Sequence, residues 1–222
     1  LPKDRTVRLY VSESFLGNED NQAFLKEFPA YEAVTDSVFE AMSDTRTPQG
    51  VLALVKQYEY GLSDLLKDRR AAHLIFLENI QDPGNLGTIF RTAEAAGADG
   101  VIMSSRTADI YNPKTIRSTM GAVYRVPFFY TEDLSSIIKM LRERGTAVYA
   151  AHLRATAFYD AFDYRQSTAF LIGNEANGLR EETAGCADTL LGIPMEGKAE
   201  SLNAAVASSI LLYEAHRQRR NG

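Results

Sequence analysis

Short apolar segments alternate with amphipathic segments from residue 73 onward. The apolar segments cover residues 73–78, 100–103, 147–150, 169–172 and 189–193. Helical periodicity covers residues 86–96, 133–144 and 201–218, and the second of these helices is followed by Gly145, a typical helix-ending residue. Strands that are apolar on both faces and alternate with helices are typical of a parallel sheet with helices on both faces. We therefore predict an α/β fold here.

The first 60 residues show a less regular pattern. Strand-like segments cover residues 7–11 and 51–55, and short helical segments cover residues 21–28 and 37–42. A polar, charged stretch at residues 61–70 predicts a short linking helix. We therefore expect a small α/β domain over residues 1–60, truncated at its start, then a linker over residues 61–73 and a larger domain over residues 74–222.

Composition excludes several classes of protein. Hydrophobic residues make up 45% of the 222 residues, so a disordered chain is excluded, and no apolar run is long enough for a transmembrane helix. The first five residues contain no signal-peptide core, and the single cysteine, Cys186, cannot form an internal disulfide, so we expect a cytoplasmic protein. The three histidines lack zinc-site spacing, so no metal site is expected. The net charge of −5 argues against a general nucleic-acid coat but allows a local basic patch.

Ligands of parallel sheets bind at the carboxyl ends of the strands. In this chain, three unusual loops follow the carboxyl ends of predicted strands. The first loop spans residues 79–87, with Asn85 as the expected helix N-cap and Arg91 off the apolar stripe two turns later. A helix N-terminus with a nearby arginine suits a phosphate, whereas the alternative is a capped helix carrying a solvated arginine. The glycine spacing matches neither a dinucleotide-binding loop nor a phosphate-binding loop.

The second and third loops also place polar residues directly after buried strands. In residues 171–179, Gly173 allows close approach of a ligand to the backbone, and Glu175 can accept hydrogen bonds from Arg or Asn. In residues 193–203, Ser201 is a candidate cap of the last helix, and Asn203 is expected in its first turn. The alternatives are a plain turn and ordinary N-terminal helix chemistry.

Together and in this order, the loops resemble the three signature motifs of the SpoU (TrmH-type) RNA 2′-O-ribose methyltransferases, a family of the SPOUT superfamily. The matching segments are NLGTIFRTAEAAG (residues 85–97), LIGNEANGL (171–179) and IPMEGKAESLNAAVASSILLYEA (193–215). A further family segment resembles IRSTMGAVYRVPF (116–128), and DTRTPQGVLALV (44–55) is similar to the small RNA-binding domain of some members.

The resemblance implies a fold, a cofactor and a reaction. Members have a deep C-terminal trefoil knot, act as homodimers that share the active site between subunits, and bind S-adenosyl-L-methionine in a bent form. By motif, Gly173, Ile193 and Leu202 would contact this cofactor, and Met195 and Ala151 would line its pocket. The reaction is methyl transfer to a ribose 2′-hydroxyl of structured RNA. Arg91 matches the catalytic arginine, and the residues that would hold it and the ribose are Asn85, Glu175, Ser201 and Asn203.

The third motif of the family usually reads Asn-Val-Ser-Val-Ala, whereas residues 203–207 read Asn-Ala-Ala-Val-Ala, and the departure that matters is the missing hydroxyl at Ala205. The alternative function is a non-catalytic RNA-binding module that kept the knotted fold, and a third is a small-molecule-binding α/β protein. The extra N-terminal domain favours ribosomal RNA over transfer RNA, by analogy only. The arginines that form a candidate RNA path, with solvated surface as the alternative, are Arg5, Arg8, Arg46, Arg69, Arg70, Arg217, Arg219 and Arg220.

Overall fold

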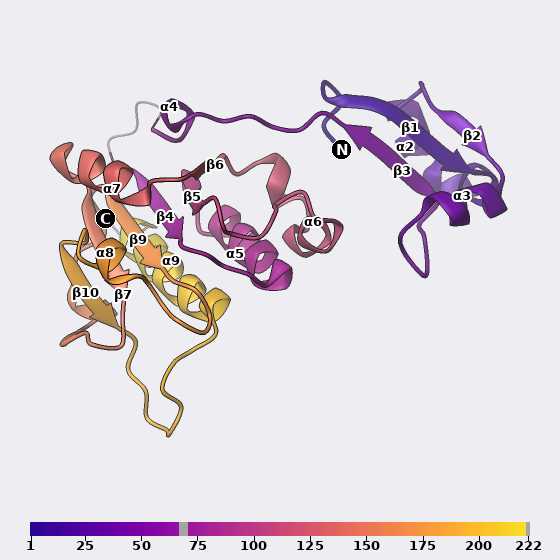
Figure 1. Cartoon of the computed structure of the whole chain (residues 1–222). Helices are drawn as coiled ribbons and strands as arrows, with labels where there is room; N and C mark the ends of the chain where they lie inside the picture. Colours follow the sequence, from indigo (N-terminus) through magenta and orange to yellow (C-terminus); the bar gives the residue numbers. More distant parts are fainter. Residues whose placement is uncertain (67–70, 221–222) are drawn as a thin grey trace. The chain divides into compact units, whose positions relative to one another are not determined.

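The computed structural model describes residues 1–66 and 71–220, which include all but the last part of the predicted linking helix. The chain divides into two compact units, Leu1–Tyr58 and Glu59–Gly222 (Figure 1). Arg69 and Arg70 of the candidate RNA path lie outside the described residues.

The N-terminal unit is a three-stranded mixed sheet with short helices. Its strands are β1 (Thr6–Ser12), β2 (Glu32–Val34) and β3 (Val51–Val55), in the order β2-β1-β3, with β1 parallel to β2 and antiparallel to β3. Its helices are α1 (Glu13–Leu16), α2 (Gln22–Glu27) and α3 (Asp36–Met42), with a 3₁₀ turn at Glu19–Asn21. Leu9, Val11 and Leu25 form a small buried core.

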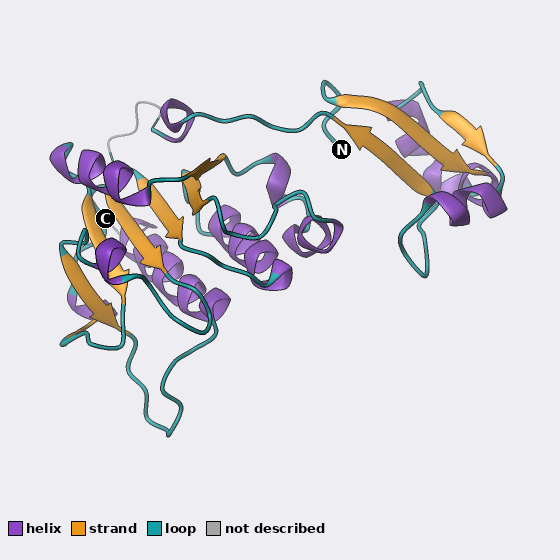
Figure 2. Cartoon of the chain, in the orientation of Figure 1, coloured by secondary structure: helices purple, strands orange, loops and turns teal. Residues whose placement is uncertain are grey.

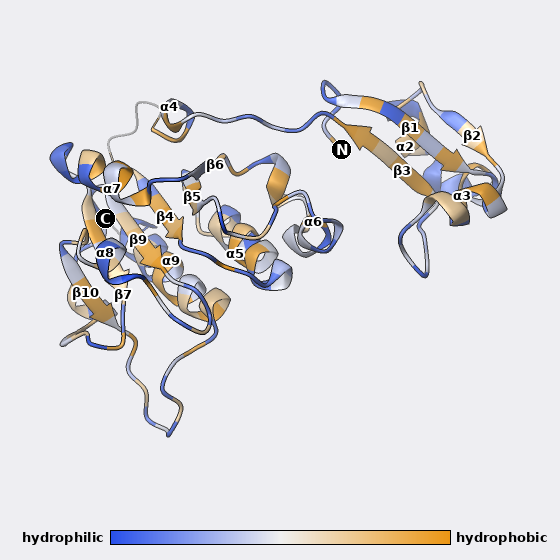
Figure 3. Cartoon of the chain, viewed as in Figure 1, coloured by the Kyte–Doolittle hydropathy of each residue, from blue (hydrophilic) through white to orange (hydrophobic). Residues whose placement is uncertain are grey.

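The C-terminal unit is built on a seven-stranded sheet in the order β6-β5-β4-β9-β7-β10-β8, and every neighbouring pair is parallel. The strands are β4 (His73–Leu77), β5 (Gly100–Ser104), β6 (Phe128–Thr131), β7 (Ala147–Ala151), β8 (Ala157–Phe158), β9 (Thr168–Ile172) and β10 (Thr189–Gly192). The central strands β4, β5 and β9 are buried throughout and largely apolar (Figure 3). Burial on both faces explains their unbroken apolar sequence.

Helices cover both faces of this sheet (Figure 2). They are α4 (Leu62–Leu65), α5 (Pro83–Ala95), α6 (Pro113–Thr119), α7 (Leu134–Glu143), α8 (Glu181–Ala184) and α9 (Ala204–Arg220). Two 3₁₀ turns lie at Ala122–Tyr124 and Tyr159–Ala161. Side chains of α7 and α8 share a core cluster with Leu74 and Phe76 of β4. Helix α5 packs against both α6 and α9.

The predicted α/β fold is confirmed, whereas two predicted helix caps are wrong. Asp82, not Asn85, caps α5, because its carboxylate accepts the amide N–H of Asn85 and Pro83 occupies the first helical position. Asn203, not Ser201, caps α9, since its Oδ1 accepts the amides of Ala205 and Val206. The trefoil knot stays a prediction.

Candidate active site

The three loops meet at the carboxyl edge of the sheet through one chain of polar side chains. Nδ2 of Asn203, at the start of α9, donates to Oδ1 of Asn85 at 3.0 Å, and Nδ2 of Asn85 donates to Oε1 of Glu175 at 3.0 Å. These residues are 90 and 118 positions apart in the sequence, so the fold brings them together. Three of the five predicted catalytic residues are therefore in direct contact.

Glu175 is the main acceptor of this chain. Its carboxylate also accepts the backbone amides of Gln81 at 3.2 Å and Asp82 at 3.3 Å. Burial raises the pKa of the Glu175 carboxyl, but the hydrogen bonds from Asn85 and from the Gln81 and Asp82 amides outweigh it and hold the pKa below its ordinary value. In its charged form, the Glu175 carboxylate therefore holds the first loop against the second.

A pocket of about 470 Å³ opens beside this polar chain. Its volume lies within the range of small-molecule sites. All five residues predicted to contact the cofactor line it, namely Ala151, Gly173, Ile193, Met195 and Leu202. Glu175 and Ser201 line it too.

Gly173 occupies a position with no room for a side chain. A Cβ atom there would lie 2.1 Å from the carbonyl carbon of Gly178 and 2.2 Å from the amide nitrogen of Leu179, both backbone atoms. The loop folds back on itself, because Asn174 and Gly178 exchange backbone hydrogen bonds of 3.0 and 2.9 Å. Glycine therefore allows this tight loop to form one wall of the pocket.

Arg91 lies on the exposed surface of α5, outside the lining of this pocket. It shares one helical stripe with Gly87, which packs against Ser118, and with Glu94, which pairs with Arg125. Within residues 1–66 and 71–220 the Arg91 guanidinium makes no hydrogen bond or ion pair. Its five N–H donors are therefore available to a ligand.

Sequence reasoning missed two residues that shape the site. Asn79 has a left-handed backbone with φ of 57°, and its side chain and amide pair with Ser104 Oγ at 2.9 and 2.8 Å. Nδ2 of Asn174 donates to the Asn79 carbonyl at 2.8 Å, which joins the first two loops a second time. An asparagine directly after a buried strand was the available signal, because asparagine tolerates positive φ.

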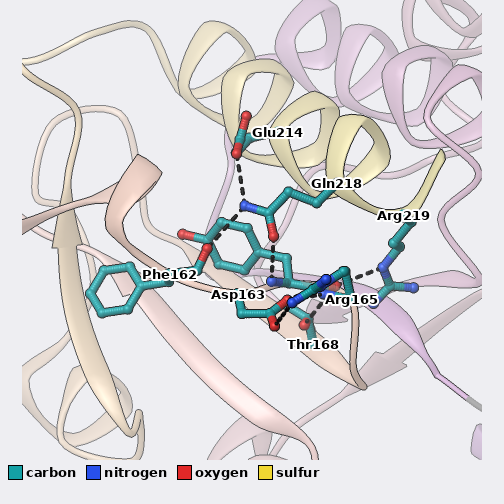
Figure 4. Close-up of polar contacts among 8 residues, drawn as sticks. Phe162, Asp163, Arg165, Thr168, Glu214, Gln218 and Arg219 are labelled. Atoms are coloured by element: carbon teal, nitrogen blue, oxygen red, sulfur yellow. Dashed lines mark hydrogen bonds and ion pairs between the residues drawn. The ribbon is translucent and has the colours of Figure 1, made fainter. Parts of the chain in front are cut away.

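Most arginines of the candidate RNA path have intramolecular partners. Arg5 lies over the Tyr58 ring and donates to the Gln57 carbonyl. Arg8 pairs with Glu32 and Arg217 with Glu214. Arg219, labelled in Figure 4, donates to the backbone carbonyls of Ala71, Ala72, Tyr164 and Gln166. Arg46 and Arg220 are exposed. The prediction of a basic tail open to RNA is therefore wrong for Arg219, because backbone acceptors use its donors.

Two features are absent from the described residues. No cluster of His, Cys, Asp or Glu within residues 1–66 and 71–220 is arranged to hold a metal ion. In the same residues, no helix is long and apolar enough to cross a bilayer.

Curated relatives are RNA methyltransferases. The chain is 37% identical over 180 residues to 23S rRNA (guanosine(2553)-2′-O)-methyltransferase RlmP of Bacillus subtilis, covering 81% of this chain and 70% of the relative. It is 30% identical to 23S rRNA (guanosine-2′-O-)-methyltransferase RlmB of Shewanella oneidensis, covering 98% and 92% of the two chains.

Solved structures and family comparisons agree with these relatives. The AdoMet complex of the SpoU methyltransferase AviRb from Streptomyces viridochromogenes superposes with a TM-score of 0.85 at 28% identity, covering 98% of this chain and 84% of that one. Residues 2–61 match the family described as RNA 2′-O ribose methyltransferase substrate binding. Residues 72–213 match the SpoU rRNA methylase family, and the chain belongs to this family.

Proposed function

We propose that this protein transfers a methyl group from S-adenosyl-L-methionine to a ribose 2′-hydroxyl of ribosomal RNA. The observation that carries the proposal is the pocket at the carboxyl edge of the sheet, which gathers every residue expected to contact the cofactor. The family membership and the 23S rRNA relatives support the same reaction.

The residues of the pocket fit this cofactor. Gly173 brings the backbone of the second loop to the pocket surface, where main-chain groups can bind adenine, while Ile193 and Leu202 supply apolar contacts. Met195 and Ala151 complete the wall. When bound, the cofactor supplies an electrophilic methyl group on a sulfonium. The chain then has to orient that group toward the incoming hydroxyl oxygen.

Arg91 acts as an electrostatic clamp in this proposal. A guanidinium stays protonated in proteins, so it is a poor base but a strong partner for an RNA phosphate or a developing alkoxide. The methyl group of the bound cofactor would pass to the ribose 2′-hydroxyl oxygen, leaving a neutral thioether, and the hydroxyl proton would pass to solvent water. The chain from Asn203 through Asn85 to Glu175 holds the three loops in register, and Ser201 faces the pocket at the same edge.

We also assign the domains, the oligomeric state and the class of RNA. Residues 1–60 are the RNA substrate-binding domain, supported by the family match over residues 2–61. Residues 61–73 are the linker, and residues 74–222 are the methyltransferase domain with the trefoil knot. The protein works as a cytoplasmic homodimer and prefers ribosomal over transfer RNA.

Catalysis is favoured over the non-catalytic RNA-binding module. Two named relatives are 2′-O-methyltransferases, and the chain keeps the five polar motif residues, which are Asn85, Arg91, Glu175, Ser201 and Asn203. Ala205 is buried at the start of α9, where its amide N–H donates to Asn203 and its carbonyl accepts from Ser209. Both bonds use the backbone, so the missing hydroxyl does not remove them.

Calorimetric titration with S-adenosyl-L-methionine, followed by methylation of ribosomal RNA with labelled cofactor, tests the proposal. We expect micromolar binding and a label that digestion assigns to a 2′-O-methylated nucleoside. Binding without any methyl transfer would favour the RNA-binding module. Absence of cofactor binding would overturn the proposed function.

A further inference from the structure

Glu78 is a buried carboxylate directly after β4, outside the pocket lining. Its side chain is only 1% exposed. Oε2 accepts the backbone N–H of Arg180 at 2.7 Å, while Oε1 accepts Nε–H of Arg180 at 2.7 Å and the hydroxyl of Thr183. The carboxylate therefore has three donors from the segment that follows the second loop.

The backbone of Glu78 holds the other end of the same loop. Its amide N–H donates to the carbonyl of Ile172 at 2.9 Å, and β4 runs parallel to β9 up to that point. Ile172 precedes Gly173, and Arg180 follows Leu179. One residue thus fixes both ends of the loop formed by residues 173–179, all of which line the pocket.

The chemistry of this contact requires a charged carboxylate. A buried carboxylate is stable only when several donors compensate its lost hydration, and here an arginine supplies two of them. A carboxamide of the same shape has one acceptor oxygen, and its NH₂ group would face an N–H or O–H donor. Replacing the charge would therefore release one of the contacts that hold the loop.

We propose that Glu78 is the positioning residue of the cofactor pocket, holding residues 173–179 in the conformation that binds S-adenosyl-L-methionine. The inference rests on the proposed function, because the cofactor is assigned there. Glu78 acts through the loop and touches neither cofactor nor RNA.

The test compares Glu78→Gln with Asp99→Asn, a matched variant of an acid that contacts the opposite end of β4. Asp99 is also a buried acid, and its Oδ2 accepts the backbone N–H of His73 at 2.7 Å at the start of β4. Both variants, in the full chain, are measured by thermal unfolding, by calorimetric titration with S-adenosyl-L-methionine well below the unfolding temperature, and by hydrogen exchange of residues 173–180.

We expect both variants to unfold at lower temperature. Glu78→Gln alone should raise the Kd for the cofactor at least tenfold and speed amide exchange of the loop by a similar factor, whereas Asp99→Asn should keep the Kd within twofold. A folded Glu78→Gln variant that binds as well as the unmodified protein would overturn this proposal and leave the proposed function standing. Absence of binding by the unmodified protein would overturn both.

A milder variant decides the question if Glu78→Gln does not fold. Thr183→Val removes one of the three donors while keeping the side-chain shape, and Thr183 is fully buried. We expect a two- to fivefold increase in the Kd and faster exchange across residues 173–180. Unchanged binding and exchange in this variant would contradict the positioning role.

Discussion

The two edges of the C-terminal sheet carry similar polar residues but use them differently. At the amino edge, Arg219 donates to four backbone carbonyls. Beside it, Gln218 joins the Tyr164 amide to the Phe162 carbonyl and to Glu214 (Figure 4). At the carboxyl edge, a pocket remains, and Arg91, on the helix α5 that begins at this edge, makes no polar contact within the described part of the chain. The amino edge thus stabilises the end of α9, while the carboxyl edge keeps donors available for a ligand.

Residue type alone therefore does not identify a binding surface. Arg91 and Arg219 are both arginines on helices, and both were candidates for contact with RNA. What separates them is whether backbone acceptors already satisfy the guanidinium. Substitutions at the two edges should therefore separate effects on function from effects on stability.

The largest effect should follow from Arg91→Ala. If Arg91 stabilises charge during methyl transfer, its loss should lower kcat by about 10²–10³-fold, the usual cost of removing one preorganised donor. The Kd for S-adenosyl-L-methionine should stay within twofold, because Arg91 lies outside the pocket lining. Single-turnover methylation and calorimetry measure the two quantities. Near-normal turnover would remove Arg91 from the mechanism.

Substitution of Gly173 should act on the cofactor instead. In Gly173→Ala the new Cβ would overlap backbone atoms of Gly178 and Leu179, so the loop must move and the Kd should rise about a hundredfold, or about 2.7 kcal/mol. Gly197→Ala is the matched control in the third loop, since a Cβ there meets nothing within 4 Å. Equal binding by the two variants would show that the second loop does not form the pocket wall.

The long strands of the sheet could be predicted from the sequence, whereas the shortest strand and one helix cap could not. Strands β4 and β9 were recognisable because burial on both faces demands unbroken apolar residues. Strand β8 has only two residues, too few to show a period. The sequence offers two start signals for α5, Asp82-Pro83 and Asn85. The prediction followed Asn85 and placed the cap three residues too late, whereas the helix begins after Asp82.

The partners of polar side chains were the least predictable part of the site. Arg219 reaches Ala71, which is 148 residues away, and Glu78 reaches Thr183, which is 105 residues away. Contacts over such separations depend on the order of strands in the sheet. The motifs therefore indicated which loops matter, but the fold alone shows which side chains remain open.

At the amino edge, substitution should change stability and leave cofactor binding intact. Arg219→Met would remove one donor from each of four backbone carbonyls, three of which still accept from Thr168, and should lower the free energy of unfolding by about 2 kcal/mol. Arg217→Met is the control, because Arg217 is exposed and its ion pair in residues 1–66 and 71–220 is with Glu214, so its loss should cost about 0.5 kcal/mol or less. Chemical denaturation measures both. A higher Kd for the cofactor in Arg219→Met would contradict the separation of stability at the amino edge from binding at the carboxyl edge.

The smallest predicted effect is a pH dependence that also originates at the amino edge. His73 starts β4, is 1% exposed, and neither ring nitrogen has a hydrogen-bond partner among the described residues. Burial, with smaller contributions from the nearby charges of Arg219 and His216, lowers its pKa from 6.5 to about 3. The unfolded chain therefore takes up a proton near pH 6.5 that the folded chain refuses until about pH 3, so this stabilising contribution is lost as the pH falls through that window.

Between pH 7 and 5.5 the free energy of unfolding should fall by about 1 kcal/mol from this group. His73→Phe should flatten that part of the profile, because phenylalanine carries no proton and can keep the edge-to-face contact with Phe170. Denaturation curves at several pH values measure the difference. An unchanged slope in the variant would mean that the pKa of His73 is the same in the folded and the unfolded chain, and then burial at the amino edge would not exclude charge from this side chain.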